Sequence, residues 1–185
     1  MPLARVLARF TLLFIALATL PIPARATTLI RLGLERLAAE NELVAQAKIV
    51  EIHSYWNADH TFILTDVRAE ASQVLKGAHA AAVTFTLMGG TVGEVTTLII
   101  GGPDLVPGSE YVLFLSRGNL PGAPGRLTVR DESQGVFEVR SGRAFSQASG
   151  EPLLPDASGV AAAPGGDAGL TVDELAHQVR QNSDR

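Results

Sequence analysis

Cysteine is absent from this chain of 185 residues. Its absence excludes disulfide bonds, thiolate metal sites, a cysteine nucleophile and lipidation of an N-terminal cysteine. The stability of the folded chain must therefore rest on an apolar core, which a domain of roughly 120 residues can supply.

Positive charge is also scarce, because 15 Lys and Arg stand against 19 Asp and Glu and the formal net charge is −4. The lysines and arginines form no cluster, whereas binding to nucleic-acid phosphates requires clustered positive charge. We therefore expect no nucleic-acid partner. The acidic residues are spread along the chain, which is typical of a surface that favours solubility.

Motifs for catalysis are missing as well. Ser109 and Ser116 lack the Gly-x-Ser-x-Gly context of a hydrolase nucleophile. The glycine-rich stretches 89–93 and 99–103 lack the lysine of a phosphate-binding loop. The acidic pair Asp131-Glu132 falls in a predicted turn and is expected to face water. These absences predict a protein that is not an enzyme and that carries no cofactor.

An uncharged apolar run at residues 10–20 is preceded by Arg5 and Arg9 and is followed by prolines and the small-residue sequence Ala24-Arg25-Ala26. This order is typical of a secretory signal peptide with a cleavage site. A transmembrane anchor is the alternative, but it requires about 20 apolar residues. We expect residues 1–26 to be removed by cleavage after Ala26, which predicts a secreted or periplasmic protein without a membrane anchor.

The clearest alternation of apolar and polar residues lies in the stretch 62–77, which ends on a turn glycine. Small or apolar residues occupy every second position from Ile63 to Ala71, which is the period of a half-buried strand. The stretch is longer than a usual strand and Val74-Leu75 breaks its phase, so we expect a bend or bulge near residues 72–74. Such a bent strand is typical of a small β-barrel.

Other segments predict further elements. A helix is expected at 27–40 and strands at 43–52, 82–88, 95–100, 111–115, 127–130 and 135–140, with a polar turn at 53–61 and a loop at 119–125. Residues 111–115 lack alternation, which predicts a central strand that is covered on both faces. The expected fold is mainly β, a small OB-like barrel of roughly five to seven strands at residues 27–145, with a small sandwich as the second choice.

The C-terminal part differs in composition. Residues 146–169 are rich in Ala, Gly, Pro and Ser, which predicts a flexible linker. The helix expected in residues 170–185 begins with the Thr-x-x-Glu spacing of a capping box at Thr171 and Glu174. Its apolar stripe is expected to dock on the barrel, although a partner chain or a frayed helix are alternatives.

Four stretches together carry a family resemblance. LAAENELVAQAKIVEI is followed by a long strand ending in VLKG, then by GGTVG and PGSEYVLFL. This order, over about residues 34–143, resembles a group of uncharacterised exported bacterial proteins. It also resembles, more distantly, the OB-fold module of tissue inhibitors of metalloproteinases and the netrin-like domains. The resemblance implies an OB fold. Those inhibitors chelate the metal of the protease with an N-terminal cysteine, which this chain lacks, so no inhibitory residue is implied.

Candidate binding residues lie in the polar turn at 53–61. Tyr55 and Trp56 are adjacent aromatic residues in a segment where no core requires them, and Asp59 and His60 lie beside them. Exposed aromatic residues on loops are typical of contact sites, although Trp56 could instead cover the mouth of the barrel. We therefore expect Tyr55, Trp56, Asp59 and His60 to bind a ligand.

A metal site is an alternative for the same turn, where His53, Asp59 and His60 supply two imidazoles and a carboxylate. Metal is nevertheless not expected, because three exposed polar residues in a turn explain the pattern. The alternating charges of Asp66, Arg68 and Glu70 are interpreted as a solvated strand face rather than as a site.

Three functions follow from these patterns. The first is an exported, non-catalytic binding module whose partner is another exported protein such as a peptidase, with peptidase inhibition as its sharper form. The second is an assembly component of the cell envelope whose C-terminal helix docks on another chain. The third is a metal-dependent hydrolase that uses the histidines of the turn.

Overall fold

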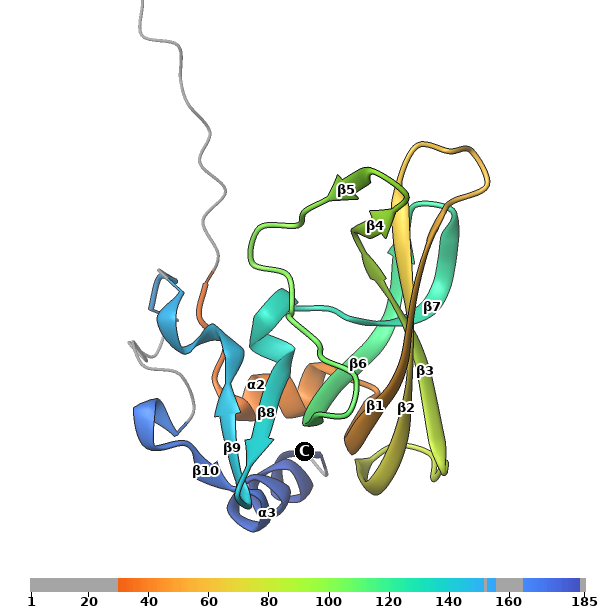
Figure 1. Ribbon diagram of the computed structural model, residues 1–185. Coiled ribbons are helices and arrows are strands. Elements are labelled where there is room, and N and C mark those ends of the chain that lie inside the picture. The colour runs from red at the N-terminus through yellow and green to blue at the C-terminus, as the bar shows by residue number, and fades with distance from the viewer. Residues whose placement is uncertain (1–29, 152, 156–164, 184–185) are drawn as a thin grey trace, which may run out of the picture.

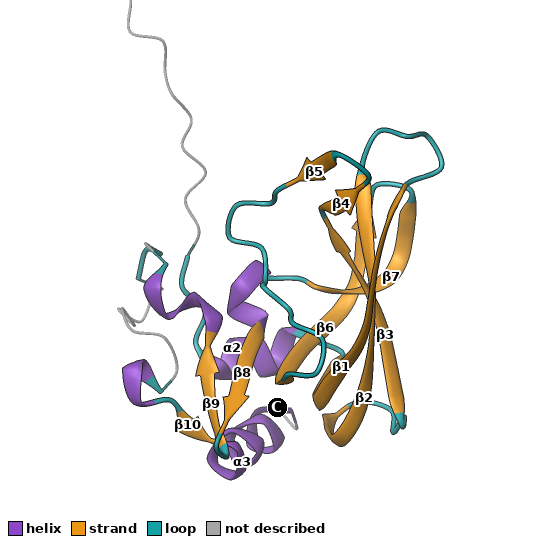
Figure 2. Ribbon diagram, in the orientation of Figure 1, coloured by secondary structure: helices purple, strands orange, loops and turns teal. Residues whose placement is uncertain are grey.

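The structure is a computed structural model that describes residues 30–151, 153–155 and 165–183 (Figure 1). The predicted signal peptide lies outside the described residues, as do positions 152 and 156–164 of the expected linker. The described chain is mainly β, with a helix near each end of it (Figure 2). The prediction of a mainly β fold with an N-terminal and a C-terminal helix is therefore confirmed.

The helices and strands have the following bounds: α2 Leu34–Glu40, β1 Leu43–Trp56, β2 Ile63–Lys76, β3 Ala82–Met88, β4 Gly90–Val92, β5 Val95–Thr97, β6 Glu110–Leu120, β7 Ala123–Val129, β8 Val136–Arg140, β9 Arg143–Ser146, β10 Leu170–Thr171 and α3 Val172–Ser183. Short 3-10 turns lie at Glu132–Gly135, Gln147–Gly150 and Gly166–Ala168.

Strand β6 is the centre of the described sheet. The main order of strands is β10-β9-β8-β6-β1-β2-β3, and β7 also pairs with β6. One edge of β6 pairs with β1, while the other edge pairs with β8 at residues 110–113 and with β7 at residues 115–120. The turn Glu132–Gly135 connects β7 to β8 at the point where that shared edge changes partner. The strand expected at 135–140 is present as β8, and the sheet has more strands than expected because β9 and β10 extend it beyond β8.

Strands β3 and β7 lie close together, and β1, β2 and β6 connect them through ladders on the other side. No hydrogen-bonded ladder joins β3 to β7 within the described part of the chain. The described sheet is therefore curled but not a closed barrel. We call the unpaired boundary between β3 and β7 the seam.

The bend expected in β2 is present. Ala45 pairs with Val74 and Val44 with Lys76, so Leu75 is an extra residue in the ladder. Ser72 is skipped in the same way between the pairs that involve Gln73 and Ala71. An extra residue on one strand bends it and increases its twist. The prediction of a bulge near residues 72–74 is confirmed.

Two apolar clusters cover opposite faces of β1 and β6. One cluster packs α2 and α3 against one face and contains Leu37, Val44, Val112, Phe114 and Leu175. The other fills the curled side of the sheet with side chains that include Ile49, Val67, Phe85, Leu113 and Leu115. Alternate residues of Tyr111 to Leu115 thus face different cores, which confirms that this strand is covered on both faces.

Helix α3 docks on its own chain, as its sequence predicts. Leu175, Ala176 and Val179 are buried in the cluster that also contains α2. The capping box is formed: the backbone N–H of Thr171 donates to Glu174 Oε2 at 2.9 Å, and the N–H of Glu174 donates to Thr171 Oγ1 at 3.2 Å. The described residues of the expected linker include part of β9 and two of the 3-10 turns.

Several expected boundaries are wrong. Residues 53–56 continue β1 instead of forming a turn, because β2 is long enough to pair with each of them. Residues 119–125 form the tip of the β6–β7 hairpin rather than an open loop, since the turn at Pro121-Gly122 is tight. The strand expected at 95–100 stops at Thr97, because residues 98–100 pair with no strand in the described part of the chain.

Candidate functional site

The loop between β1 and β2 is organised by the side chain of Asn57, which is buried. Its Oδ1 accepts the backbone N–H groups of Thr61 at 2.8 Å and Phe62 at 3.0 Å. Its Cβ lies 3.0 Å from where a Cβ on Gly122 would stand, so the tip of the β6–β7 hairpin packs against this loop. Two hairpin ends therefore share one end of the molecule with β4 and β5 (Figure 1).

The four expected binding residues are only partly brought together. Trp56 ends β1 half-buried and its ring stacks on that of His60, with centroids 6.1 Å apart. Asp59 is exposed in the loop. Tyr55 is not a loop residue: it lies in β1, stacks on His53, and donates its hydroxyl to Asp66 at 3.1 Å. Tyr55 and Trp56 are not exposed on a loop because β1 pairs with β2 as far as residue 56.

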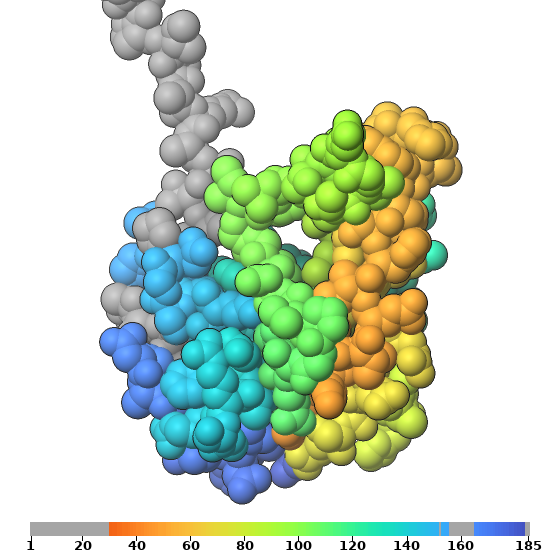
Figure 3. Space-filling model, viewed as in Figure 1, coloured from red at the N-terminus to blue at the C-terminus, as the bar shows by residue number. Residues whose placement is uncertain are grey.

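The segment 98–109, which follows β5, is the most exposed apolar part of this end. Leu98 is 82% exposed and Ile100 is 88% exposed, while Ile99 between them points inward. Figure 3 shows the green segment as an arch that stands away from the body of the molecule, with a hollow beneath it. Phe62 and Val95 add partly exposed apolar surface on the neighbouring loops.

A cleft of about 620 Å³ lies beside the base of this arch. Its lining includes the apolar side chains of Leu87, Ile99 and Leu120 and the charged side chains of Arg117 and Glu132. This volume lies within the range of small-molecule sites, and a mixed apolar and polar lining is typical of binding clefts. Apolar side chains on the arch thus border an apolar cleft at the same end of the protein.

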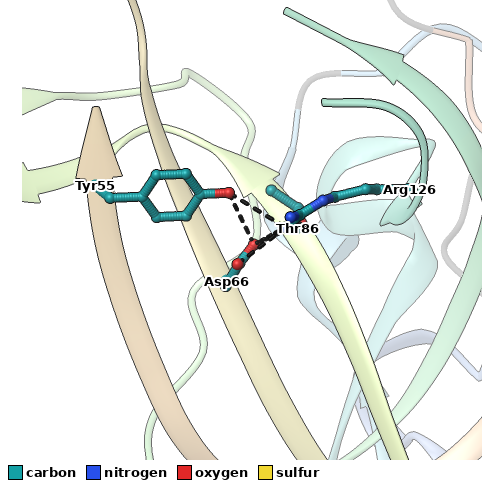
Figure 4. A network of polar contacts seen from close by, with 4 residues as sticks. All are labelled: Tyr55, Asp66, Thr86 and Arg126. Atoms are coloured by element: carbon teal, nitrogen blue, oxygen red, sulfur yellow. Dashed lines mark hydrogen bonds and ion pairs between the residues drawn. The ribbon is translucent and has the colours of Figure 1, made fainter. Parts of the chain in front are cut away.

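A network of polar side chains crosses four strands and bridges the seam (Figure 4). Arg126 Nη1 on β7 donates to both carboxylate oxygens of Asp66, at 2.8 and 2.9 Å, and to Thr86 Oγ1 at 3.2 Å. Thr86 Oγ1 donates to Asp66 Oδ1 at 2.6 Å, and the Tyr55 hydroxyl lies 3.3 Å from Arg126 Nη1. These side-chain bonds connect β3 to β7 where no backbone ladder does.

The network corrects the interpretation of Asp66 as part of a solvated row. Partial burial acts to raise the pKa of Asp66, but hydrogen bonds from Thr86, Arg126 and Tyr55 and the charge of Arg126 hold this pKa below its ordinary value. Burial and the charge of Asp66 raise the pKa of Tyr55. Sequence reasoning missed Arg126 because it lies 60 residues from Asp66. The neighbouring Thr86 is brought to Asp66 by the pairing of β2 with β3, which was not predicted either.

The turn between β7 and β8 contains two acidic side chains, Asp131 and Glu132, that lack the hydrogen-bond donors found around Asp66. Within the described residues, no hydrogen-bond partner is found for Asp131 Oδ2 or Glu132 Oε2, although both atoms are buried. Glu132 also adopts a left-handed backbone conformation with φ 55°. Burial raises the pKa of both carboxyl groups, and the charges of Glu151 and Asp131 raise that of Glu132 further. The expectation that this pair simply faces water is wrong.

Clustered metal ligands and membrane-spanning helices are both absent from the described residues. No group of three or more His, Asp or Glu side chains there is arranged to hold a metal ion, so His53, Asp59 and His60 do not form the alternative metal site. Among the described helices, none has the length and apolar character needed to span a membrane.

Comparison with known proteins finds no matching family, curated protein or solved structure.

Proposed function

We propose that this chain is an exported, non-catalytic binding module with an OB-like fold that contacts another exported protein through its loop end. The loop end comprises the loop 57–62, the β4–β5 hairpin and the arch 98–109. The observation that carries the proposal is the exposure of Leu98 and Ile100 beside an apolar cleft. Large exposed apolar side chains in a cluster are typical of surfaces that bind proteins.

The OB-like part of the proposal is supported by strand order. Strands β1, β2 and β3 form a meander, and β6 returns to pair with β1 before turning into β7 beside β3. This order follows that of a five-stranded, partly open Greek-key barrel, whose loops commonly form its binding surface. The apolar run at residues 10–20 supports export.

The alternative functions have less support. The assembly role was expected to use the apolar stripe of the C-terminal helix, and this stripe is buried on α2 and the sheet. The hydrolase was expected to use His53, Asp59 and His60, which are not gathered as metal ligands in the described structure. A peptidase remains the sharper form of the proposed partner.

The proposal is tested by capturing proteins from the secreted or periplasmic fraction with the immobilised chain. Replacing both Leu98→Ser and Ile100→Ser should abolish capture of the specific partner, because it removes the apolar contacts. Leu154→Ser is the matched control, since Leu154 is also exposed but lies outside the loop end. A partner that the double variant retains as well as the control does would overturn the assignment of this surface.

A further inference from the structure

A recess of about 360 Å³ lies beside the network, at the outer side of the seam. Arg117 and Arg126 contribute guanidinium groups to its lining, Asp66 contributes a carboxylate, and Thr84 and Thr86 contribute hydroxyl groups. Two cations thus share the recess with one anion. None of the residues expected from sequence to bind a ligand lines it.

Arg126 uses only one of its nitrogens in the network. All its hydrogen bonds to Asp66, Thr86 and Tyr55 are made by Nη1. Among the described residues, no partner is found for its Nε or Nη2. The edge of a guanidinium that carries Nε and Nη2 presents two parallel N–H donors, a geometry that matches a carboxylate.

Asp66 holds this free edge in place without competing for it. Its carboxylate already accepts from Tyr55, Thr86 and Arg126, and the pair with Arg126 fixes the position of the guanidinium. Arg117 is held less firmly: its Nη1 donates to the carbonyl of Gly125 at 2.8 Å, and its Nε lies 3.6 Å from the exposed Glu42. The guanidinium group of Arg117 therefore has a donor left for an incoming anion.

We propose that this recess binds a carboxylate group of a polypeptide, through the Nε–Nη2 edge of Arg126 with Arg117 as a second donor. A singly charged carboxylate suits the recess better than a phosphate, because it neutralises the one net positive charge of Arg117, Arg126 and Asp66, whereas a dianion would leave an uncompensated negative charge there. Arg117 also lines the larger cleft, but no residue of the loop end lines the recess, so the two proposals can fail separately.

Nuclear magnetic resonance of the full chain tests the proposal through the Nε–H signal of Arg126. The probes are the peptide acetyl-Gly-Glu-Gly-amide, its Gln counterpart and inorganic phosphate. We expect the Glu peptide to shift this signal saturably, the Gln peptide to leave it unchanged, and phosphate to bind more weakly. Equal shifts with the Glu and Gln peptides, or tighter binding of phosphate, would overturn the proposal.

Three variants distinguish binding at the Nε–Nη2 edge of Arg126 from an effect on the fold. Arg126→Lys keeps the positive charge but lacks a second donor edge, so it should weaken binding of the Glu peptide about tenfold. Thr84→Glu leaves the network intact and places a carboxylate in the recess, so it should abolish binding. Arg180→Gln, on exposed α3 surface, is the control and should change nothing. Peptide binding to the variants is measured through the backbone amide signal of Leu127, which also lines the recess. If Thr84→Glu binds the Glu peptide as well as the natural chain does, the proposed site is wrong.

Discussion

Asp66 and Glu132 are both partly buried carboxylates, yet the protein treats them in opposite ways. Asp66 lies on a strand and accepts hydrogen bonds from three side chains, including an arginine. Glu132 lies on a turn, has a buried oxygen for which no partner is found among the described residues, and has φ 55°. The difference shows that the donors around a carboxylate, rather than burial alone, decide whether it stabilises the fold.

The two regions also have different places in the sheet. The network replaces a missing ladder between β3 and β7, so its bonds hold the seam together. The acidic turn lies where β6 changes partner from β7 to β8, so its backbone must turn sharply there. The pairing of β2 with β3 places the hydrogen-bond donor Thr86 beside Asp66. The turn instead places Glu132 near the carboxylates of Glu151 and Asp131.

The largest expected effect comes from breaking the network. Asp66→Ala should lower the free energy of unfolding by about 2 kcal/mol, because it leaves the buried hydroxyl of Thr86 and the side chain of Arg126 without their acceptor. Urea unfolding measures this change.

Glu70→Ala is the control for that prediction, since Glu70 lies on the same face of β2 but is exposed. It should change the free energy of unfolding by less than about 0.5 kcal/mol. Equal losses in the two variants would mean that the donors around Asp66 contribute nothing.

A gain is expected at the acidic turn. Glu132→Gly should raise the free energy of unfolding by about 1 kcal/mol, because glycine accepts the left-handed backbone and the substitution removes the buried carboxylate oxygen. Thermal and urea unfolding both measure this gain.

Ser141→Gly separates the two causes, because Ser141 also has a positive φ but is exposed and carries no carboxylate. Its gain should be smaller than that of Glu132→Gly. If the two gains are equal, backbone strain alone explains the turn and the contrast with Asp66 fails.

Local patterns in the sequence predict much of the fold. The alternation in 63–71 predicts β2, the unbroken apolar run at 111–115 predicts the doubly covered part of β6, and the Thr171–Glu174 spacing predicts the cap of α3. Each of these signals is carried by residues close in sequence. The strand predicted at 135–140 is present as β8, but the extension of the sheet by β9 and β10 is not predicted, because strands of four and two residues carry too few residues for a clear period.

The candidate site is less predictable, because it depends on pairings between distant strands. The turn at 53–61 is correctly identified as unusual in its aromatic content, but Tyr55 belongs to the network rather than to a loop. Arg126 follows a Pro-Gly segment that predicts a loop, so nothing local places its guanidinium beside Asp66. The exposure of Leu98 and Ile100 likewise depends on the fact that no described strand pairs with residues 98–100.

The smallest expected effect is the pH dependence, and its sign differs between the two regions. The lowered pKa of Asp66 means that its stabilisation is present above its ordinary value of 3.8 and is lost as the pH falls through the folded-state pKa. The raised pKa of Glu132 means that its contribution is present below its ordinary value of 4.5 and is lost as the pH rises through its folded-state pKa. At neutral pH, Asp66→Asn should therefore be less stable than the natural chain, and Glu132→Gln more stable. On acidification from pH 7 to pH 3, the stability of Asp66→Asn relative to the natural chain should rise and that of Glu132→Gln should fall, each by no more than about 1 kcal/mol. Urea unfolding at several pH values measures both trends, and trends of the same sign would contradict the opposite environments assigned to the two carboxylates.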